Sequence, residues 1–149
     1  MLVYLDICCF NRPFDDQSQL LIKLQTEAKL SVQDAIRQGS LCLAWSAIMD
    51  LENAANPDSE RREAIALWKA NSSVDVDAGA DVEGRAEGLR LLGIKPMDAL
   101  HVASAIEVGA SWLLTTDSAR LKKMQNDTRI RVADPIDFVR ALTESNDEH

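Results

Sequence analysis

The sequence PMDALHVASAIEVGASWLLTTD, residues 96–117, joins a predicted helix to a predicted buried strand and has an acidic residue near each end. Pro96 suits the first turn of a helix, where its missing N–H is not needed, and Gly109 suits the residue after a helix end. The helix is therefore expected at 97–108. The apolar run at 111–116 has the length of a buried strand.

The helix at 97–108 carries an acid on its inward side. At helical spacing Asp98 shares a face with Val102 and Ala105, whereas Ser104 and Glu107 lie on a polar arc. Carboxylates are rarely buried without a partner, so this position requires a stabilising group.

Two further acids follow predicted strands. Asp117 comes directly after the strand at 111–116, and Asp6 follows the apolar run LVYL at 2–5. Ligands of open α/β sheets bind beyond the carboxyl ends of the strands, so these positions are suited to chemistry.

Strands and helices alternate along the whole chain, which predicts a three-layer α/β/α fold with a parallel, Rossmann-like sheet of four to five strands and helices on both faces. The strands are expected at 2–5, 41–45, 74–76, 111–116 and 130–132. The remaining helices are expected at 18–38, 46–55, 60–70, 80–92, 118–124 and 135–142, with a loop at 8–17.

Composition predicts one soluble domain. The 149 residues, 46% of them hydrophobic, suffice for one core, with the domain at 1–142 and a frayed polar tail at 143–149. The N-terminus has neither a basic signal region nor a membrane span, so we expect no membrane association and a cytoplasmic location. The three cysteines, Cys8, Cys9 and Cys42, form no CxxC pair and are expected as buried reduced thiols.

Two helices have predicted inward faces. In the helix at 46–55, with Ser46 as its N-cap, the inward stripe of Ile48, Leu51 and Ala55 includes Glu52, and Asp50 lies on the opposite side. The helix at 18–38 is expected to bury Leu20, Leu21, Leu24, Ala28, Val32, Ala35 and Ile36.

Four acidic residues thus lie at strand ends or on inward faces: Asp6, Glu52, Asp98 and Asp117. Gathered together they would repel one another and take up protons unless a positive charge lay between them. A hard divalent cation, Mg²⁺ or Mn²⁺, binds oxygen ligands and meets this requirement. Asp50 competes with Glu52 as the second acid.

Each acid also has a structural interpretation. Asp6 and Asp117 suit helix caps or turns, Asp98 is favoured by the helix dipole, and Glu52 is a solvated residue if the helix is rotated. His101 is interpreted as a residue at the helix edge, since one histidine without a serine or cysteine partner is weak evidence for nucleophilic catalysis. Asp134, before Pro135, is expected to be a cap.

The motifs LVYLD, SAIMDLE, DALHVASA and LLTTD, in this order, together resemble those of the PIN-domain ribonucleases. The resemblance is strongest to the VapC-type toxins of prokaryotic toxin–antitoxin pairs, and it extends to the final IRVADPIDFV. One departure is that Ile7 and Cys8 follow Asp6, where the family often has Thr or Ser.

The resemblance implies a Mg²⁺- or Mn²⁺-dependent endoribonuclease that hydrolyses RNA phosphodiester bonds. It assigns the metal and catalytic roles to Asp6, Glu52, Asp98 and Asp117, and a hydroxyl that orients water to Thr115 or Thr116. It further implies a cognate antitoxin and a homodimer.

The net charge of −8 disfavours binding of RNA by charge alone, so a cation at the acids would have to supply the positive charge. Candidates for contacts with phosphates are Arg12, Lys95, Arg120, Lys122 and Lys123, the last three of which equally suit a solvated surface. One alternative is a non-catalytic binding module of the same fold. A phosphatase is disfavoured because Asp6-Ile7-Cys8 lacks an Asp-x-Asp pair.

Overall fold

The computed structural model describes residues 1–147. Five parallel strands form one sheet in the order β3-β2-β1-β4-β5. The strands are β1 (Leu2–Leu5), β2 (Cys42–Ser46), β3 (Ser72–Val76), β4 (Trp112–Leu114) and β5 (Arg131–Ala133). Each overlaps a predicted strand, so the parallel sheet expected from the sequence is confirmed.

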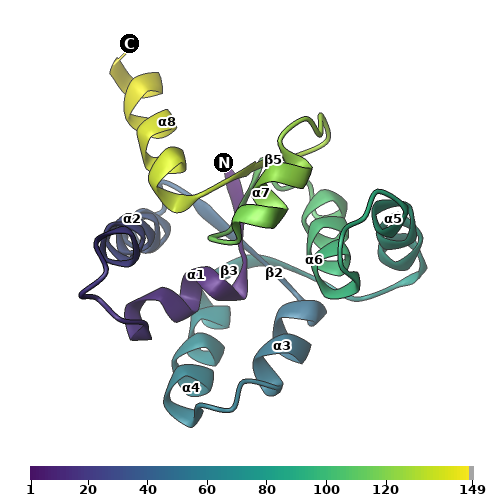
Figure 1. Cartoon of the computed structure of the whole chain (residues 1–149), viewed down its shortest axis with the longest axis horizontal. Helices are drawn as coiled ribbons and strands as arrows, with labels where there is room; N and C mark the ends of the chain where they lie inside the picture. The colour runs from purple at the N-terminus through teal and green to yellow at the C-terminus, as the bar shows by residue number, and fades with distance from the viewer. Residues whose placement is uncertain (148–149) are drawn as a thin grey trace.

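The helices lie on both sides of the sheet. Figure 1 shows α2 and α8 on one side of the strands and α5 and α6 on the other, which confirms the three-layer α/β/α fold. The helices are α1 (Ile7–Asn11), α2 (Leu20–Arg37), α3 (Ala47–Ala54), α4 (Ser59–Trp68), α5 (Ala80–Leu91), α6 (Pro96–Glu107), α7 (Ser118–Met124) and α8 (Pro135–Asp147). Two 3₁₀ turns, Arg12–Phe14 and Lys69–Asn71, follow α1 and α4.

The centre of the sheet contains its topological switch point. From β1 the chain adds β2 and β3 on one side and then crosses to the other side to add β4 and β5. The backbone N–H of Asp6 donates to the carbonyl of Leu114 at 2.9 Å, so the residues that follow β1 and β4 lie side by side. This is where α/β sheets bind ligands.

The core strands are apolar because both faces of the sheet are covered. Val3, Tyr4 and Leu5 of β1 are buried, as are Leu113 and Leu114 of β4. None of the helices formed by residues 1–147 combines the length and the apolar character needed to cross a lipid bilayer.

One predicted loop contains a helix. The segment after Asp6 forms α1, and the Asp6 side chain caps it by accepting the N–H of Ile7 at 2.8 Å. Cys9 and Phe10 point into the core from this helix. The expected loop at 8–17 is therefore wrong for its first residues, because a cap followed by buried apolar residues is sufficient for a short helix.

The inward face of α2 differs from the prediction in its first half. Leu20, Leu21 and Leu24 are exposed, and the buried residues are Gln25, Thr26, Lys29, Val32, Gln33 and Ile36. Gln25 tolerates burial because it accepts a hydrogen bond from Arg12 Nε at 2.8 Å and donates one to Asp134. Tertiary hydrogen bonds therefore outweigh the apolar pattern here.

The inward face of α3 is rotated relative to the prediction. Leu51 and Ala55 are exposed, whereas Met49 and Asn53 join Ile48 in the buried set. Ser46 is the N-cap as expected, since its hydroxyl accepts the N–H of Met49 at 3.1 Å.

Three smaller expectations are also corrected. Ser104 is buried because its hydroxyl donates to the carbonyl of Leu100 at 2.8 Å, and Cys42 is exposed at the start of β2. Helix α8 continues past Leu142 to Asp147, since no proline or glycine interrupts it. Positions 148 and 149 of the predicted tail lie outside the described residues.

Candidate metal centre

Asp6 is the buried acid at the switch point. Only 1% of the residue is exposed, and it continues directly from β1. Its Oδ1 accepts the N–H of Ile7 at 2.8 Å, and its Oδ2 accepts the hydroxyl of Thr115 at 3.0 Å. The carboxylate is therefore held in one orientation, and Oδ1 can accept a further ligand.

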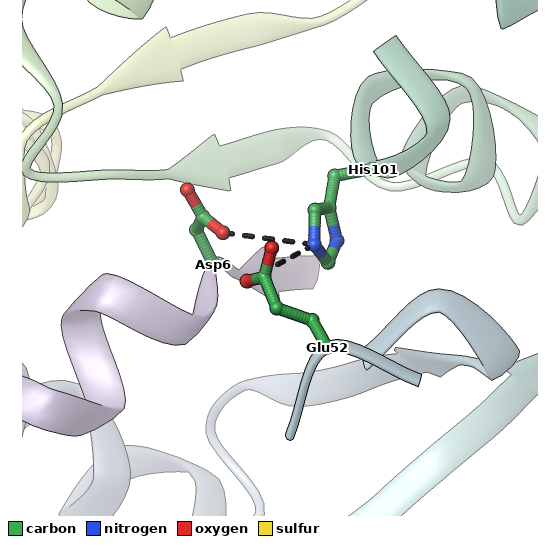
Figure 2. Close-up of side chains that lie close together, drawn as sticks. All are labelled: Asp6, Glu52 and His101. Carbon is green, nitrogen blue, oxygen red and sulfur yellow. Dashed lines mark ion pairs between the residues drawn. The ribbon is translucent and has the colours of Figure 1, made fainter. Parts of the chain in front are cut away.

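Glu52 and His101 approach Asp6 from two different helices, α3 and α6. Figure 2 shows the three side chains converging on one point. His101 Nε2 lies 3.4 Å from Glu52 Oε1 and 4.0 Å from Asp6 Oδ1. One ligand atom from each residue lies within 4.8 Å of the other two.

The His101 ring is fixed from its far side. Its Nδ1 lies 2.6 Å from the hydroxyl of Tyr4, which lies 2.6 Å from the hydroxyl of Ser46. Burial raises the pKa of Tyr4 above its usual range, so its hydroxyl keeps its proton. His101 Nε2 is fully buried and has no hydrogen-bond partner among the described residues.

Asp98 lies on the other side of Asp6, together with Arg120. The guanidinium of Arg120 contacts Oδ2 of Asp6 and Oδ1 of Asp98, and only 7% of Arg120 is exposed. Burial lowers the pKa of Arg120 to about 10, so it stays charged at neutral pH. Burial raises the pKa of Asp98, the negative charges of Asp117 and Glu52 raise it further, and interactions with His101 and Lys95 oppose this shift.

Asp117 caps α7 and also lies beside Asp98. Its Oδ1 accepts the N–H groups of Ala119 at 3.0 Å and Arg120 at 3.1 Å, as the cap interpretation expects. With Asp98, Lys95 and Lys123 it lines a depression of about 60 Å³. The structure therefore brings all four predicted acids to one end of the sheet, with Asp6 at their centre.

Asp50 is turned away from this centre. It accepts the indole N–H of Trp45 and an ammonium N–H of Lys69, both at 2.9 Å. Of the two acids that the sequence left open, Glu52 is the one beside Asp6.

Of the two threonines predicted to supply a hydroxyl, Thr115 is the one whose hydroxyl contacts Asp6. Its Oγ donates to Asp6, whereas Thr116 donates its backbone N–H to the sulfur of Cys8 at 3.3 Å. Cys8 Sγ lies 3.4 Å from both Asp6 Oδ2 and Thr115 Oγ. Cys8 thus lies beside the first acid, where the resemblance to PIN-domain ribonucleases leads us to expect Thr or Ser.

The predicted basic residues are divided between several places. Arg120 is buried between acids, and Lys95 and Lys123 lie at the depression beside Asp117. Arg12 is engaged with Asp15 at 2.8 Å, and Lys122 is exposed.

The donors of Asp6, Glu52 and His101 fit a divalent cation. Two carboxylates supply charge, and the imidazole nitrogen is a common metal ligand when it is neutral. An unpaired buried nitrogen costs free energy, and a cation at this point would remove that cost.

Comparison with models of protein families and with curated protein sequences found no match. Among solved structures, the chain is similar to one in the crystal structure of VapBC2 from Rickettsia felis bound to a DNA fragment from their promoter. The two chains have 15% sequence identity and a TM-score of 0.56, with 90% of this chain and 98% of that chain covered. The fold is PIN-like. The similarity confirms the fold expected from the motifs, and at 15% identity it establishes the fold alone.

The sequence interpretation missed His101 as a site residue and gave Arg120 a different role. His101 was interpreted as an edge residue, yet it follows Asp98 by one helical turn on the same inward face, which was a usable signal. Arg120 was a candidate for contacts with phosphates, and its contact with Asp6 was not predicted because it depends on how α7 returns across the end of the sheet.

Proposed function

We propose that this protein is a metal-dependent endoribonuclease and the toxin of a type II toxin–antitoxin pair. The observation that carries this proposal is the convergence of Asp6, Glu52 and the unpaired nitrogen of His101 at the switch point of a PIN-like fold. Buried acids in a perturbed environment at a ligand-binding position are typical of active sites.

The proposed reaction is hydrolysis of an RNA phosphodiester bond. A bound Mg²⁺ or Mn²⁺ ion would polarise the scissile phosphate and lower the pKa of a water molecule. Asp6 and Glu52 would hold the ion, and Thr115 keeps the Asp6 carboxylate in place. Asp98 and Asp117 complete the acidic end of the site.

The depression beside the acids offers positive charge to the substrate. Lys95 and Lys123 line it together with Asp98 and Asp117, and Lys123 donates to the carbonyl of Gly93 at 2.8 Å. We propose that these lysines contact the phosphates that flank the cleaved bond, which would compensate locally for the net charge of −8.

The proposed partners are a cognate antitoxin and a second copy of this chain, in the cytoplasm. The similar VapBC2 structure contains a DNA fragment from the promoter of that pair, which supports an antitoxin partner here. A gene for a small partner protein beside the gene of this chain, and copurification of the two proteins, would support this part of the proposal. The absence of such a gene would contradict the toxin role and leave the nuclease untouched.

The direct test is RNA cleavage by purified Asp6→Asn, which removes one ligand charge at constant size. We expect cleavage by the wild type with Mg²⁺ or Mn²⁺, no cleavage with a chelator, and none by the variant. Asp137→Asn is the matched control, since the Asp137 side chain is 65% exposed on α8. Equal cleavage by Asp6→Asn and wild type would overturn the site.

A second test uses cells. Expression of the wild type is expected to arrest growth, and Asp98→Asn is expected to relieve the arrest without reducing the amount of soluble protein. Growth arrest by both proteins would contradict the role of Asp98.

One observation favours a second candidate, a non-catalytic binding module of the same fold. The guanidinium of Arg120 neutralises the negative charges of Asp6 and Asp98, so part of the acidic cluster is stable without a metal ion. Calorimetry that detects no binding of Mg²⁺ or Mn²⁺ would favour this candidate.

A further inference from the structure

His101 belongs to the cluster that supports the proposed function, but the proposed reaction assigns it no role. The residue is fully buried, and its Nε2 has no hydrogen-bond partner among the described residues. A buried unpaired nitrogen is costly, so its persistence beside two carboxylates requires a physical reason.

The distances around His101 Nε2 match those between ligands of one metal ion. Nε2 lies 3.4 Å from Glu52 Oε1 and 4.0 Å from Asp6 Oδ1. Ligand atoms that are each about 2.1 Å from the same ion lie roughly 3 to 4 Å apart, depending on the angle between them. Figure 2 shows the ring edge facing the two carboxylates.

One arrangement of the hydrogen bonds behind the ring leaves a lone pair on Nε2. Met49 N–H donates to Ser46 Oγ at 3.1 Å, and Tyr4 lies between Ser46 and His101 Nδ1 with 2.6 Å contacts to both. If Tyr4 donates to Ser46, its oxygen accepts the Nδ1–H of His101, and Nε2 is the unprotonated nitrogen. Metal-bound histidines commonly donate their other N–H in this way.

The alternative tautomer does not satisfy the ring. With a proton on Nε2, the nearest acceptor is Glu52 Oε1 at 3.4 Å, and this contact lacks the geometry of a hydrogen bond. With a lone pair on Nε2, the nitrogen faces two negative oxygens, and a cation between the three atoms resolves the repulsion.

The contact between Arg120 and Asp6 leaves the space beside His101 open. Arg120 contacts Oδ2 of Asp6, whereas the oxygen nearest to His101 is Oδ1. The space bounded by Asp6 Oδ1, Glu52 and His101 is therefore distinct from that filled by the guanidinium.

We infer that His101 Nε2 is a metal ligand together with Asp6 and Glu52, and that the site consequently selects a first-row transition ion over Mg²⁺. Imidazole suits transition ions, whereas Mg²⁺ prefers a shell of oxygens and water. The inference rests on the proposed function only in taking Asp6 and Glu52 as metal ligands.

The test is to load the purified protein with Mn²⁺ and measure nitrogen coupling to the ion by pulsed electron paramagnetic resonance. We expect a histidine nitrogen signal from the wild type and none from His101→Gln, whose amide oxygen replaces Nε2. The sequence has two histidines, so His149→Gln is the matched control and should keep the signal. Bound Mn²⁺ without nitrogen coupling in the wild type would overturn the inference.

Selectivity is measured separately by calorimetry with Co²⁺ and Mg²⁺. The ratio of the affinity for Co²⁺ to the affinity for Mg²⁺ should fall about ten-fold or more in His101→Gln. His101→Asn, whose amide can keep the contact with Tyr4, should show the same loss, and thermal unfolding without metal identifies any variant that fails to fold. An unchanged ratio in both folded variants would overturn the inference.

These results separate the inference from the proposed function. If bound Mn²⁺ shows nitrogen coupling but the protein does not cleave RNA, the role of His101 as a ligand is supported and the nuclease is contradicted. If the protein cleaves RNA with Mn²⁺ but the bound ion shows no nitrogen coupling, the nuclease is supported and the role of His101 as a ligand is contradicted.

Discussion

The two oxygens of Asp6 face two different environments. Oδ1 lies toward Glu52 and His101, where none of the described residues places a lysine or arginine, whereas Oδ2 lies toward Asp98 and the guanidinium of Arg120. A buried carboxylate pair with its own guanidinium is stable as folded. A carboxylate pair that faces an unpaired imidazole nitrogen has, in our proposal, an added cation as its partner. The comparison separates the part of the cluster that serves the fold from the part that is open to a metal ion.

The largest effect is expected on the side without a cation. Glu52→Gln removes a ligand charge, and the rate of RNA cleavage at saturating Mn²⁺ should fall about 10³-fold, or about 4 kcal/mol of activation free energy. Asp50→Asn, two positions away on α3 but bonded to Trp45 and Lys69, should cleave at the wild-type rate. Similar losses in both variants would mean that α3 as a whole, rather than Glu52, is required.

On the opposite side, Arg120→Met tests whether the guanidinium stabilises the fold. Without divalent ions, the free energy of unfolding in urea should fall by about 3 kcal/mol, because two acids lose their partner. Added Mn²⁺ should restore part of the loss. The control is Arg129→Met. Arg129 is exposed and lies 2.7 Å from Asp127, so its replacement should lower the free energy of unfolding by less than about 1 kcal/mol. Equal effects of the two variants would contradict the structural role of Arg120.

Lys29 is a second buried cation and, unlike Arg120, it has no acidic partner among the described residues. Lys29 is 5% exposed, lies 5.3 Å from the Phe10 ring centre, and forms no ion pair within the described part of the chain. Burial lowers its pKa from 10.5 to about 8. The unfolded chain therefore binds more protons between these pH values, and the contribution of Lys29 to stability rises with pH across that window.

Lys29→Met should accordingly stabilise the protein by about 2 kcal/mol at pH 7, where Arg120→Met destabilises it. The advantage should shrink as pH rises from 8 to 10.5, which urea unfolding of variant and wild type at several pH values measures. A difference that does not change with pH would show that packing, rather than charge, is responsible.

The smallest effect is expected from Tyr4→Phe, which removes the hydroxyl between His101 and Ser46. The loss of stability should be about 1 kcal/mol, the usual contribution of one hydrogen bond. The affinity for Mn²⁺ should fall about ten-fold, because the ring loses the group that fixes its orientation. Lower stability with unchanged affinity would limit Tyr4 to a structural role.

The sequence predicted what depends on local pattern. The strands ending in Asp6 and near Asp117 are short apolar runs, and parallel topology brings their ends together without further information. The preference for Glu52 over Asp50 followed from helical spacing, although Leu51, assigned to the same stripe, is exposed. The face of a short helix is therefore predicted only to within about one residue.

Features that depend on tertiary contacts were not predicted. Gln25 and Lys29 are buried in place of Leu20 and Leu21 because hydrogen bonds and ring contacts formed across helices stabilise them. The place of His101 in the site was not predicted, because its partner Tyr4 lies on a strand that is distant in the sequence. No local pattern encodes a pairing across that separation.

The hydrogen bond from Asp6 to Leu114 has a consequence for synthesis on the ribosome. A nascent chain that has not yet produced β4 contains Asp6 and Glu52 but lacks the strand that fixes one edge of β1. Contacts between residues far apart in sequence form late in folding, since closing the loop between them costs entropy. The proposed hydrolytic activity should therefore appear only after most of the polypeptide has been made.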